Sequence, residues 1–283
     1  MSGRWGADDE RGAANLIDAA ATLRGSACVR TGQVIPLAIP IANGQLGPAA
    51  DHRPAPQHYM TRHGGDYAAG LAEKPGYGFS DDVLMVPTHG TTHIDALAHV
   101  WQGGVMYNGF KATKVTSRGA ATCGIDKAGP LATRAIFVDF SGADPTGAIS
   151  RDQLVAAVEA TGVAPEPGDA LLVRTGWLAA WREGGADKMS SAGLHHECAS
   201  WIVEAGFALV AADNIAVEVM PSRDATCAMP LHIALTRDNG IYLAELFDFD
   251  ALAATGRRDC MLVIAPLNLR GGVGSPITPV AIL

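Results

Sequence analysis

Short apolar runs alternate with helix-like segments along most of the chain. Runs of strand length predict buried strands at residues 135–140, 170–174, 207–212, 241–245 and 260–265. Apolar residues at helical spacing predict helices at residues 150–160, 194–205, 231–237 and 250–255. Ser150 and Gln153 have the capping-box spacing that starts a helix. Strands and helices mixed in this way predict an α/β fold with a mixed sheet.

The first 80 residues are rich in Gly, Pro and Ala, and their pattern is weaker. Residues 33–40 predict a strand whose prolines suit a sheet edge. Residues 52–80 are polar and turn-rich, which favours a long loop, either a lid or binding loop or a solvated excursion. Residues 82–87 are mostly apolar and predict a buried strand that leads to His89.

Four potential metal ligands follow that strand. His89, His93, Asp95 and His99 fall within eleven residues. Imidazole and carboxylate are ligands that suit Zn²⁺ or Mn²⁺. An extended segment puts His93 and Asp95 on one face, because side chains alternate along a strand. We expect Asp95 to cap a helix over 96–100 that carries His99 back towards the other three. The alternative is that the four are separate polar residues that cap turns.

A catalytic cysteine nucleophile is the main alternative to a metal site. Cys198 follows two histidines and a glutamate, but the surrounding segment has helical spacing with Cys198, Trp201, Ile202 and Ala205 on its apolar side. We therefore interpret Cys198 as a core residue.

Composition and charge narrow the classes of protein to which the chain can belong. The chain has 283 residues, 48% of them hydrophobic, and no apparent linker, which predicts one domain over 1–283. A net charge of -8 without a Lys/Arg run disfavours nucleic acid and anionic membrane as partners. The polar start and the lack of a long apolar run disfavour a signal peptide or a membrane span. Five scattered cysteines without a C-x-x-C favour reduced thiols and a cytoplasmic location.

The segment His89–His99 resembles the signature of the metal-dependent cyclase family, which includes bacterial kynurenine formamidase and isatin hydrolase. The family pattern is His-x-Gly-Thr-His-x-Asp-x-Pro-x-His, and all four functional positions match. Thr91 replaces a Gly and Leu97 replaces a Pro of the pattern, and neither replacement removes a ligand. Further segments resemble landmarks of a longer branch of this family: 4–15, 107–109, 171–177, and His232 with Glu245.

The resemblance implies a barrel-like core with flanking helices, of the swivelling β/β/α type. It also implies a metal site at His89, His93 and Asp95, with His232 and Glu245 adding a second site bridged by Asp95. From the sequence alone, Glu245 in an apolar strand would more readily pair with an arginine. One-metal relatives lack the acid and turn the histidine to substrate, so we expect one or two divalent ions, Zn²⁺ or Mn²⁺. The resemblance further implies a homodimer or homotetramer.

The expected reaction follows from the site. A bound metal lowers the pKa of its water to about 7 and polarises a carbonyl. The resemblance makes His99 the general base and acid. We expect hydrolysis of an amide, a cyclic amide or imide, or a lactone in a small-molecule substrate. A lyase or true cyclase that acts through an enolate, and a non-catalytic metal or small-molecule binding protein, remain as alternatives.

Four other residues have open roles. Asp213 ends an apolar strand and is either a support for a ligand histidine or the cap of a turn. Arg174 is either a carboxylate clamp or the partner of Asp213 or Glu218. Trp101 and Tyr107 are either an aromatic pocket wall or core residues.

Overall fold

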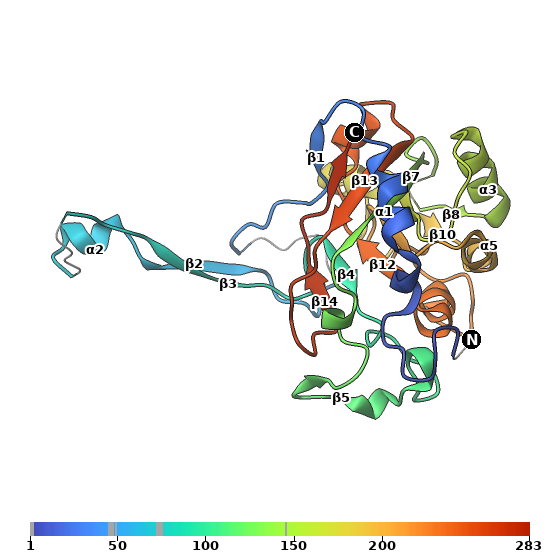
Figure 1. The fold of residues 1–283 in the computed structure, drawn as a ribbon. Coiled ribbons are helices and arrows are strands. Elements are labelled where there is room, and N and C mark those ends of the chain that lie inside the picture. Colours follow the sequence, from blue (N-terminus) through green and yellow to red (C-terminus); the bar gives the residue numbers. More distant parts are fainter. Residues whose placement is uncertain (1–2, 45–47, 49, 72–75, 145) are drawn as a thin grey trace.

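The computed structural model describes residues 3–44, 48, 50–71, 76–144 and 146–283. Its centre is a nine-stranded mixed sheet that curls into a half-barrel (Figure 1). The strands lie in the order β1 (Val34–Pro36), β15 (Val280–Ile282), β13 (Asp259–Ile264), β7 (Leu131–Asp139), β9 (Ala170–Arg174), β11 (Leu209–Ala212), β12 (Tyr242–Glu245), β4 (His93–Asp95) and β14 (Gly274–Pro276). The central pairs β7–β9, β9–β11 and β11–β12 are parallel, and the outer pairs are antiparallel.

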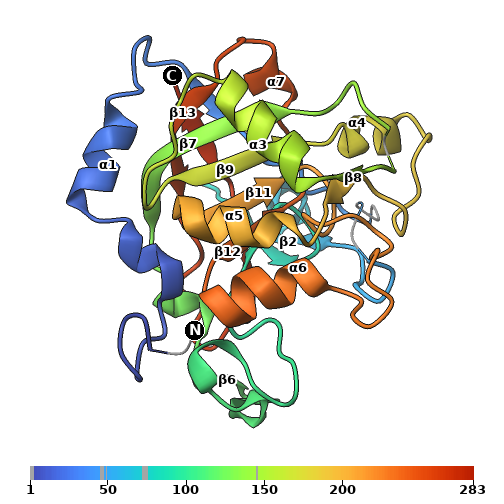
Figure 2. The same cartoon turned by 90° about the vertical axis from the view of Figure 1, so that its right-hand side faces the viewer.

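Helices cover the outer face of the parallel strands, as Figure 2 shows for α3 (Arg151–Ala160), α5 (Cys198–Ala205) and α6 (Pro230–His232). The last of these continues as a π-helical turn over Ile233–Arg237. Apolar side chains such as Leu171 and Leu243 are buried between these helices and the sheet. The other helices are α1 (Ala19–Ser26), α4 (Trp177–Arg182) and α7 (Asp250–Ala253). Short 3-10 turns lie at Gly12–Leu16, Tyr107–Gly109, Ala112–Lys114 and Ile125–Lys127, and two-stranded ladders join β5 (Val115–Thr116) to β6 (Gly119–Ala120) and β8 (Ala148–Ile149) to β10 (Gly193–Leu194).

The predicted α/β class with a mixed sheet and flanking helices is confirmed. The Ser150–Gln153 capping box forms at the start of α3, and β1 lies at a sheet edge as its prolines suggested. Outside residues 52–87 two helices, α1 and α4, were missed, although Asp18 accepts a hydrogen bond from the backbone of Ala21 as a normal helix cap.

The predicted strand over 82–87 is present, but its expected burial and the long loop expected over 52–80 are wrong. This segment forms a hairpin of β2 (Gln57–Arg62) and β3 (Asp81–Met85), with α2 (Gly64–Ala68) near its tip. Figure 1 shows this hairpin, called the arm below, extending away from the body of the molecule. All five residues of β3 are exposed, so the expected buried strand is not buried. An apolar run indicates burial only when another layer covers it, and no helix or strand of the body that the structure describes covers the arm (Figure 1).

The N-terminal segment is held against the body by residues 107 and 108. Asn108 adopts a left-handed backbone with φ 54°, which asparagine tolerates better than most residues. Its side chain donates to three backbone carbonyls of the segment Gly6–Asp9 and accepts from the Gly3 amide. The Tyr107 hydroxyl donates to Asp9 at 2.8 Å. Tyr107 is therefore a buried anchor for this segment rather than a pocket wall. Among the residues described, no helix is long and apolar enough to cross a membrane.

Candidate metal centre

Strand pairing brings the sequence-distant acid to the histidine motif. In β4, His93 and Asp95 are two residues apart and share a face of the sheet. The antiparallel pairing of β4 with β12 sets Glu245 opposite His93, and their Nε2 and Oε2 atoms lie 3.2 Å apart. On the other side of β4, Gly274 of β14 lies opposite Asp95.

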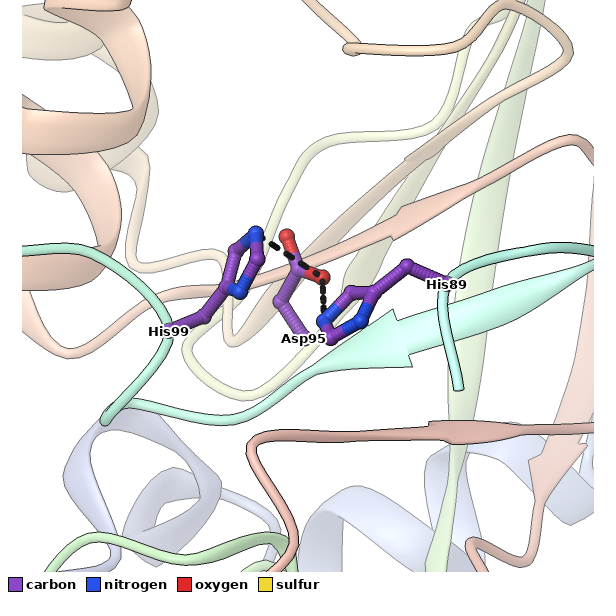
Figure 3. Close-up of side chains that lie close together, drawn as sticks. All are labelled: His89, Asp95 and His99. Carbon is purple, nitrogen blue, oxygen red and sulfur yellow. Dashed lines mark ion pairs between the residues drawn. The ribbon is translucent and has the colours of Figure 1, made fainter. Parts of the chain in front are cut away.

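Asp95 is the centre of the cluster. Its Oδ1 lies 3.2 Å from His89 Nε2, 3.6 Å from His93 Nε2 and 3.9 Å from His99 Nε2. Its Oδ2 lies 3.7 Å from His232 Nε2. Figure 3 shows the carboxylate of Asp95 facing His89 and His99, whose rings stack with their centroids 4.1 Å apart. Every predicted site residue therefore reaches the same point of the fold.

The donors form two overlapping groups that share Asp95. One holds His89, Asp95 and His99, and the other holds Asp95, His232 and Glu245, with the ligand atoms of each group within 4.8 Å of one another. His93 lies between the groups, near both carboxylates.

The cluster fits a divalent cation. His89 Nε2, His93 Nε2 and both carboxylate oxygens of Asp95 are buried and form no hydrogen bond with any residue that the structure describes. The nearest imidazole nitrogens and carboxylate oxygens are nevertheless only 3.2 Å apart. Burying such polar atoms without partners costs about 1–3 kcal/mol each. A cation among them satisfies all of them at once, and the imidazole and carboxylate donors suit Zn²⁺ or Mn²⁺. Among the described residues, Glu245 pairs with His93 and His232 and with no arginine, so the arginine alternative is wrong.

Hydrogen bonds fix the histidine rings with Nε2 facing the centre. His93 Nδ1 lies 2.7 Å from the Thr91 carbonyl, an acceptor, so Nδ1 carries the proton and Nε2 is free to bind a cation. His89 Nδ1 lies 3.0 Å from the Thr88 hydroxyl. His232 Nδ1 lies 2.6 Å from Glu218 Oε1. Carboxylate and carbonyl partners of this kind orient metal-binding histidines and make them stronger ligands.

Burial and charge act in opposite directions on the pKa values of the cluster. For His232, burial lowers the pKa, but hydrogen bonds to Glu218 and Glu245 outweigh it and raise the pKa to about 10. For Asp95, burial raises the pKa, but His99, His89 and His93 hold it far below its usual range. A buried carboxylate that stays ionised beside several imidazoles is a strong cation ligand.

His99 differs from the other histidines. Burial lowers its pKa to about 4, against the attraction of Asp95 and with the added repulsion of His89 and His232. Its side chain is 25% exposed, whereas those of His89, His93 and His232 are 8%, 1% and 2% exposed. His99 is thus neutral at pH 7, able to accept a proton, and open to a molecule that approaches from solvent.

A match to a family model extends over residues 35–219, which is more than half of the chain and includes the histidine motif. The chain belongs to the Cyclase family. The solved structure of a novel cyclase is similar over 99% of this chain and 98% of its own, with 33% identity and a TM-score of 0.89. No curated protein matches the chain.

More distant structures share the fold of this cyclase-family protein. Isatin hydrolase A from Labrenzia aggregata is 18% identical over 90% of this chain and 94% of its own, with a TM-score of 0.67. A predicted metal-dependent hydrolase from Bacillus stearothermophilus is 19% identical over 88% of this chain and 97% of its own, with a TM-score of 0.55. These likenesses support the predicted barrel-like core with flanking helices.

The way the cyclase-family chain places His99 differs from the prediction. Residues 96–100 form a turn, not a helix, and the His99 amide donates to the Ala96 carbonyl. The Ala96 and Ala98 amides donate to Val273 and Cys123, far away in sequence. Because these amides donate to residues far away in sequence, they are not available for the hydrogen bonds of a helix. The segment is therefore a turn, although its side chains favour a helix.

The residues with open roles lie outside the cluster. Asp213 accepts hydrogen bonds from Thr175 and from the Gly176 amide, so it caps the turn after β9. Arg174 pairs with Asp139 and Asp250 rather than with Asp213 or Glu218. Trp101 is 52% exposed.

Cys198 is fully buried, and burial raises the pKa of its thiol to about 12, which agrees with a core residue and not with a nucleophile.

Glu218 is the site residue that sequence reasoning missed. It is buried, and besides His232 Nδ1 it accepts from the amides of Leu231 and His232. The only sequence signal is an acid in the apolar run Ile215–Met220. Its contact with His232 joins a loop to the start of α6, which no local pattern reveals.

We expect Glu218→Gln to weaken metal binding about 10–100-fold, because it removes the charge that orients and strengthens His232. Metal affinity measured by competition with a chelator tests this. Glu197→Gln, a substitution of an exposed acid outside the cluster, is the control. Unchanged metal affinity in Glu218→Gln would contradict the role.

We also expect Gly274→Ala to weaken metal binding, because a methyl group at this position would collide with the His89 ring. The loss should exceed tenfold, and the fold should persist. Gly142→Ala is the matched control, because no described atom outside the two neighbouring residues lies within 4 Å of the added methyl. Equal metal affinity in the two variants would show that the His89 ring does not depend on this contact.

Proposed function

We propose that this cyclase-family protein is a metal-dependent hydrolase that opens an amide, a cyclic amide or imide, or a lactone carbonyl of a small molecule. One observation carries the proposal: buried, unsatisfied donors surround Asp95, and the neutral, partly exposed His99 borders them. A binding protein needs the donors but has no need for a proton acceptor at their rim. The names of the isatin hydrolase and metal-dependent hydrolase neighbours point to the same chemistry.

The positions of the donor atoms suggest a role for each residue of the cluster. His89, His93 and Asp95, whose ligand atoms lie close together, would hold one cation. Asp95, His232 and Glu245 would hold a second. A bound cation lowers the pKa of water and polarises a carbonyl. His99 removes a proton from the attacking water and later donates one to the leaving nitrogen or oxygen. Glu218 keeps His232 in its tautomer.

Metal content per chain tests the site. Protein purified without chelator or added metal should hold close to two equivalents of Zn²⁺ or Mn²⁺ by elemental mass spectrometry. A value close to one would assign a single cation to the motif and leave His232 for substrate. Protein without metal that also binds none on titration would overturn the proposal.

Turnover in H₂¹⁸O tests the reaction. A panel of formamides, cyclic imides and lactones should include a substrate whose product carries one ¹⁸O atom at the new carboxylate. Turnover without ¹⁸O in the product would favour a lyase or cyclase reaction at the same site. The absence of any turnover across the panel in metal-loaded protein would favour a binding protein.

A further inference from the structure

Residues 4–15 form a sequence motif that has no part in the metal centre. Tyr107 and Asn108 hold its first part against the body, beside the segment that carries β6 (Figure 2). Residues 9–13, called the strap below, then reach residues 96–99, called the His99 turn below. The strap therefore lies where it can affect the position of His99.

The strap packs against Leu97, which lies two residues before His99. Gly12 has a left-handed backbone with φ 59°, and a methyl group added to it would lie 2.8 Å from Leu97 Cδ1 and 2.5 Å from the Gly240 carbonyl oxygen. Only glycine allows the backbone of the strap to approach so closely. The Ala13 amide also donates to the Gly240 carbonyl at 2.8 Å. The strap is thus fixed in contact with the His99 turn, and Leu97 is 1% exposed.

A chain of two hydrogen bonds through Cys123 forms a second connection between the strap and the turn. The Glu10 carboxylate accepts from the Cys123 amide at 2.7 Å. The Cys123 carbonyl in turn accepts from the Ala98 amide at 3.0 Å. Ala98 directly precedes His99 in the sequence. One residue, Cys123, therefore joins the carboxylate of the strap to the backbone next to His99.

Cys123 depends on such partners because its backbone conformation is uncommon. Its φ is 59°, in the left-handed region that residues other than glycine rarely adopt. A conformation of this kind persists only where the surrounding contacts determine it. The Cys123 side chain is fully buried, and Glu10 is the acceptor for its amide. Loss of the Glu10 carboxylate would free Cys123, and with it the carbonyl that holds Ala98.

The His99 turn has few other backbone contacts. Among the residues described, its amides make two hydrogen bonds to distant parts of the chain, from Ala96 to Val273 and from Ala98 to Cys123. The bond to Cys123 is the nearer of the two to His99. A shift of a catalytic group by about 1 Å can slow a reaction about 10²-fold. The support of this one bond therefore matters for a base that must face both Asp95 and a substrate.

We propose that Glu10 is a positioning residue for His99. Through the amide and carbonyl of Cys123, it fixes the turn that holds the His99 ring 3.9 Å from Asp95. The inference rests on the proposed function, since it takes His99 as the base of that reaction. Glu10 acts at a distance, because its other charged partner is Lys127, 3.8 Å away, and not a residue of the cluster.

Two substitutions of Glu10 test the proposal. Glu10→Gln keeps an oxygen that can accept from the Cys123 amide, whereas Glu10→Leu has a similar size and no acceptor. We expect kcat to fall about 10–100-fold in Glu10→Leu and to stay within about threefold of wild type in Glu10→Gln. KM and metal content should stay within about twofold in both variants, because the donors around Asp95 are unchanged.

Asp18→Ala is the matched control. It removes another carboxylate near the N-terminus that accepts from a backbone amide, that of Ala21 at the start of α1. It should lower the thermal stability and leave kcat unchanged. A purely structural role of Glu10 predicts the same result for Glu10→Leu, with kcat of the folded, metal-loaded protein unchanged. Circular dichroism checks folding, and Glu10→Ala, which also lacks the acceptor, replaces Glu10→Leu if the larger side chain prevents folding.

Hydrogen exchange of residues 96–99, followed by mass spectrometry on metal-loaded protein, measures the turn without any substrate. Exchange should be at least about tenfold faster in Glu10→Leu and close to wild type in Glu10→Gln and Asp18→Ala. Unchanged exchange in Glu10→Leu, or a loss of kcat that is equal in Glu10→Gln or Asp18→Ala, would overturn the role of Glu10. Wild-type protein that turns over no substrate would refute the proposed hydrolase, and the exchange result would still decide whether Glu10 fixes the turn.

Discussion

Replacing Asp95 with Ala is expected to remove both the metal and the activity. Asp95 is the one residue common to both donor groups, and its two oxygens face four imidazoles. We expect metal content to fall at least tenfold. Turnover should fall about a thousandfold or more, since a metal supplies several kcal/mol of transition-state stabilisation and each 1.36 kcal/mol is a factor of ten.

Two further variants separate loss of the site from loss of the fold. Asp95→Asn keeps the shape of the side chain but removes the charge, and it should lose metal to a similar extent. Asp213→Asn alters another buried carboxylate that contacts Thr175 and Gly176 instead of the cluster, so it should keep its metal even if it is less stable. Metal retained at the wild-type level in Asp95→Ala would show that the centre does not depend on this residue.

Much of the metal centre could be predicted because four of its residues are close together in the sequence. His89, His93, Asp95 and His99 are close in sequence, and a strand-length segment with side chains alternating along it already brings two of them to one face. Glu245 was found through a family resemblance, since the pattern alone favoured an arginine partner. The β4–β12 register, which sets it beside His93, arises only when distant strands pair.

The errors have a common physical cause. Residues 96–100 are good helix formers, yet tertiary hydrogen bonds to Val273 and Cys123 hold them in a turn. Residues 82–87 are apolar enough for a core strand, yet they lie mostly in the exposed arm. Glu218 meets His232 only in the folded chain. In each case the structure or contact of the segment depends on residues far away in sequence. A local sequence pattern carries no information about those residues.

Replacing His99 with Ala separates catalysis from metal binding. We expect the variant to keep its metal content and to lose turnover by about 10²–10⁴-fold, the usual contribution of a general base. His99 is the most exposed histidine of the cluster and lies farthest from the Asp95 carboxylate, at 3.9 Å, which suits proton transfer to substrate better than a place in the metal shell. His196→Ala, which changes a histidine outside the cluster, is the control and should leave turnover unchanged.

The pH profile distinguishes this role from a structural one. Because the pKa of His99 is lowered to about 4, it is in its basic form from about pH 5 upwards, and a bound cation lowers the pKa further. The wild-type kcat/KM should therefore fall only below about pH 4, and protonation of His99 should not limit it near neutrality. The residual activity of His99→Ala should lack that acid limb when metal content is held constant. If metal and activity fall together in His99→Ala, His99 is a ligand of the first donor group, and the base must be sought elsewhere.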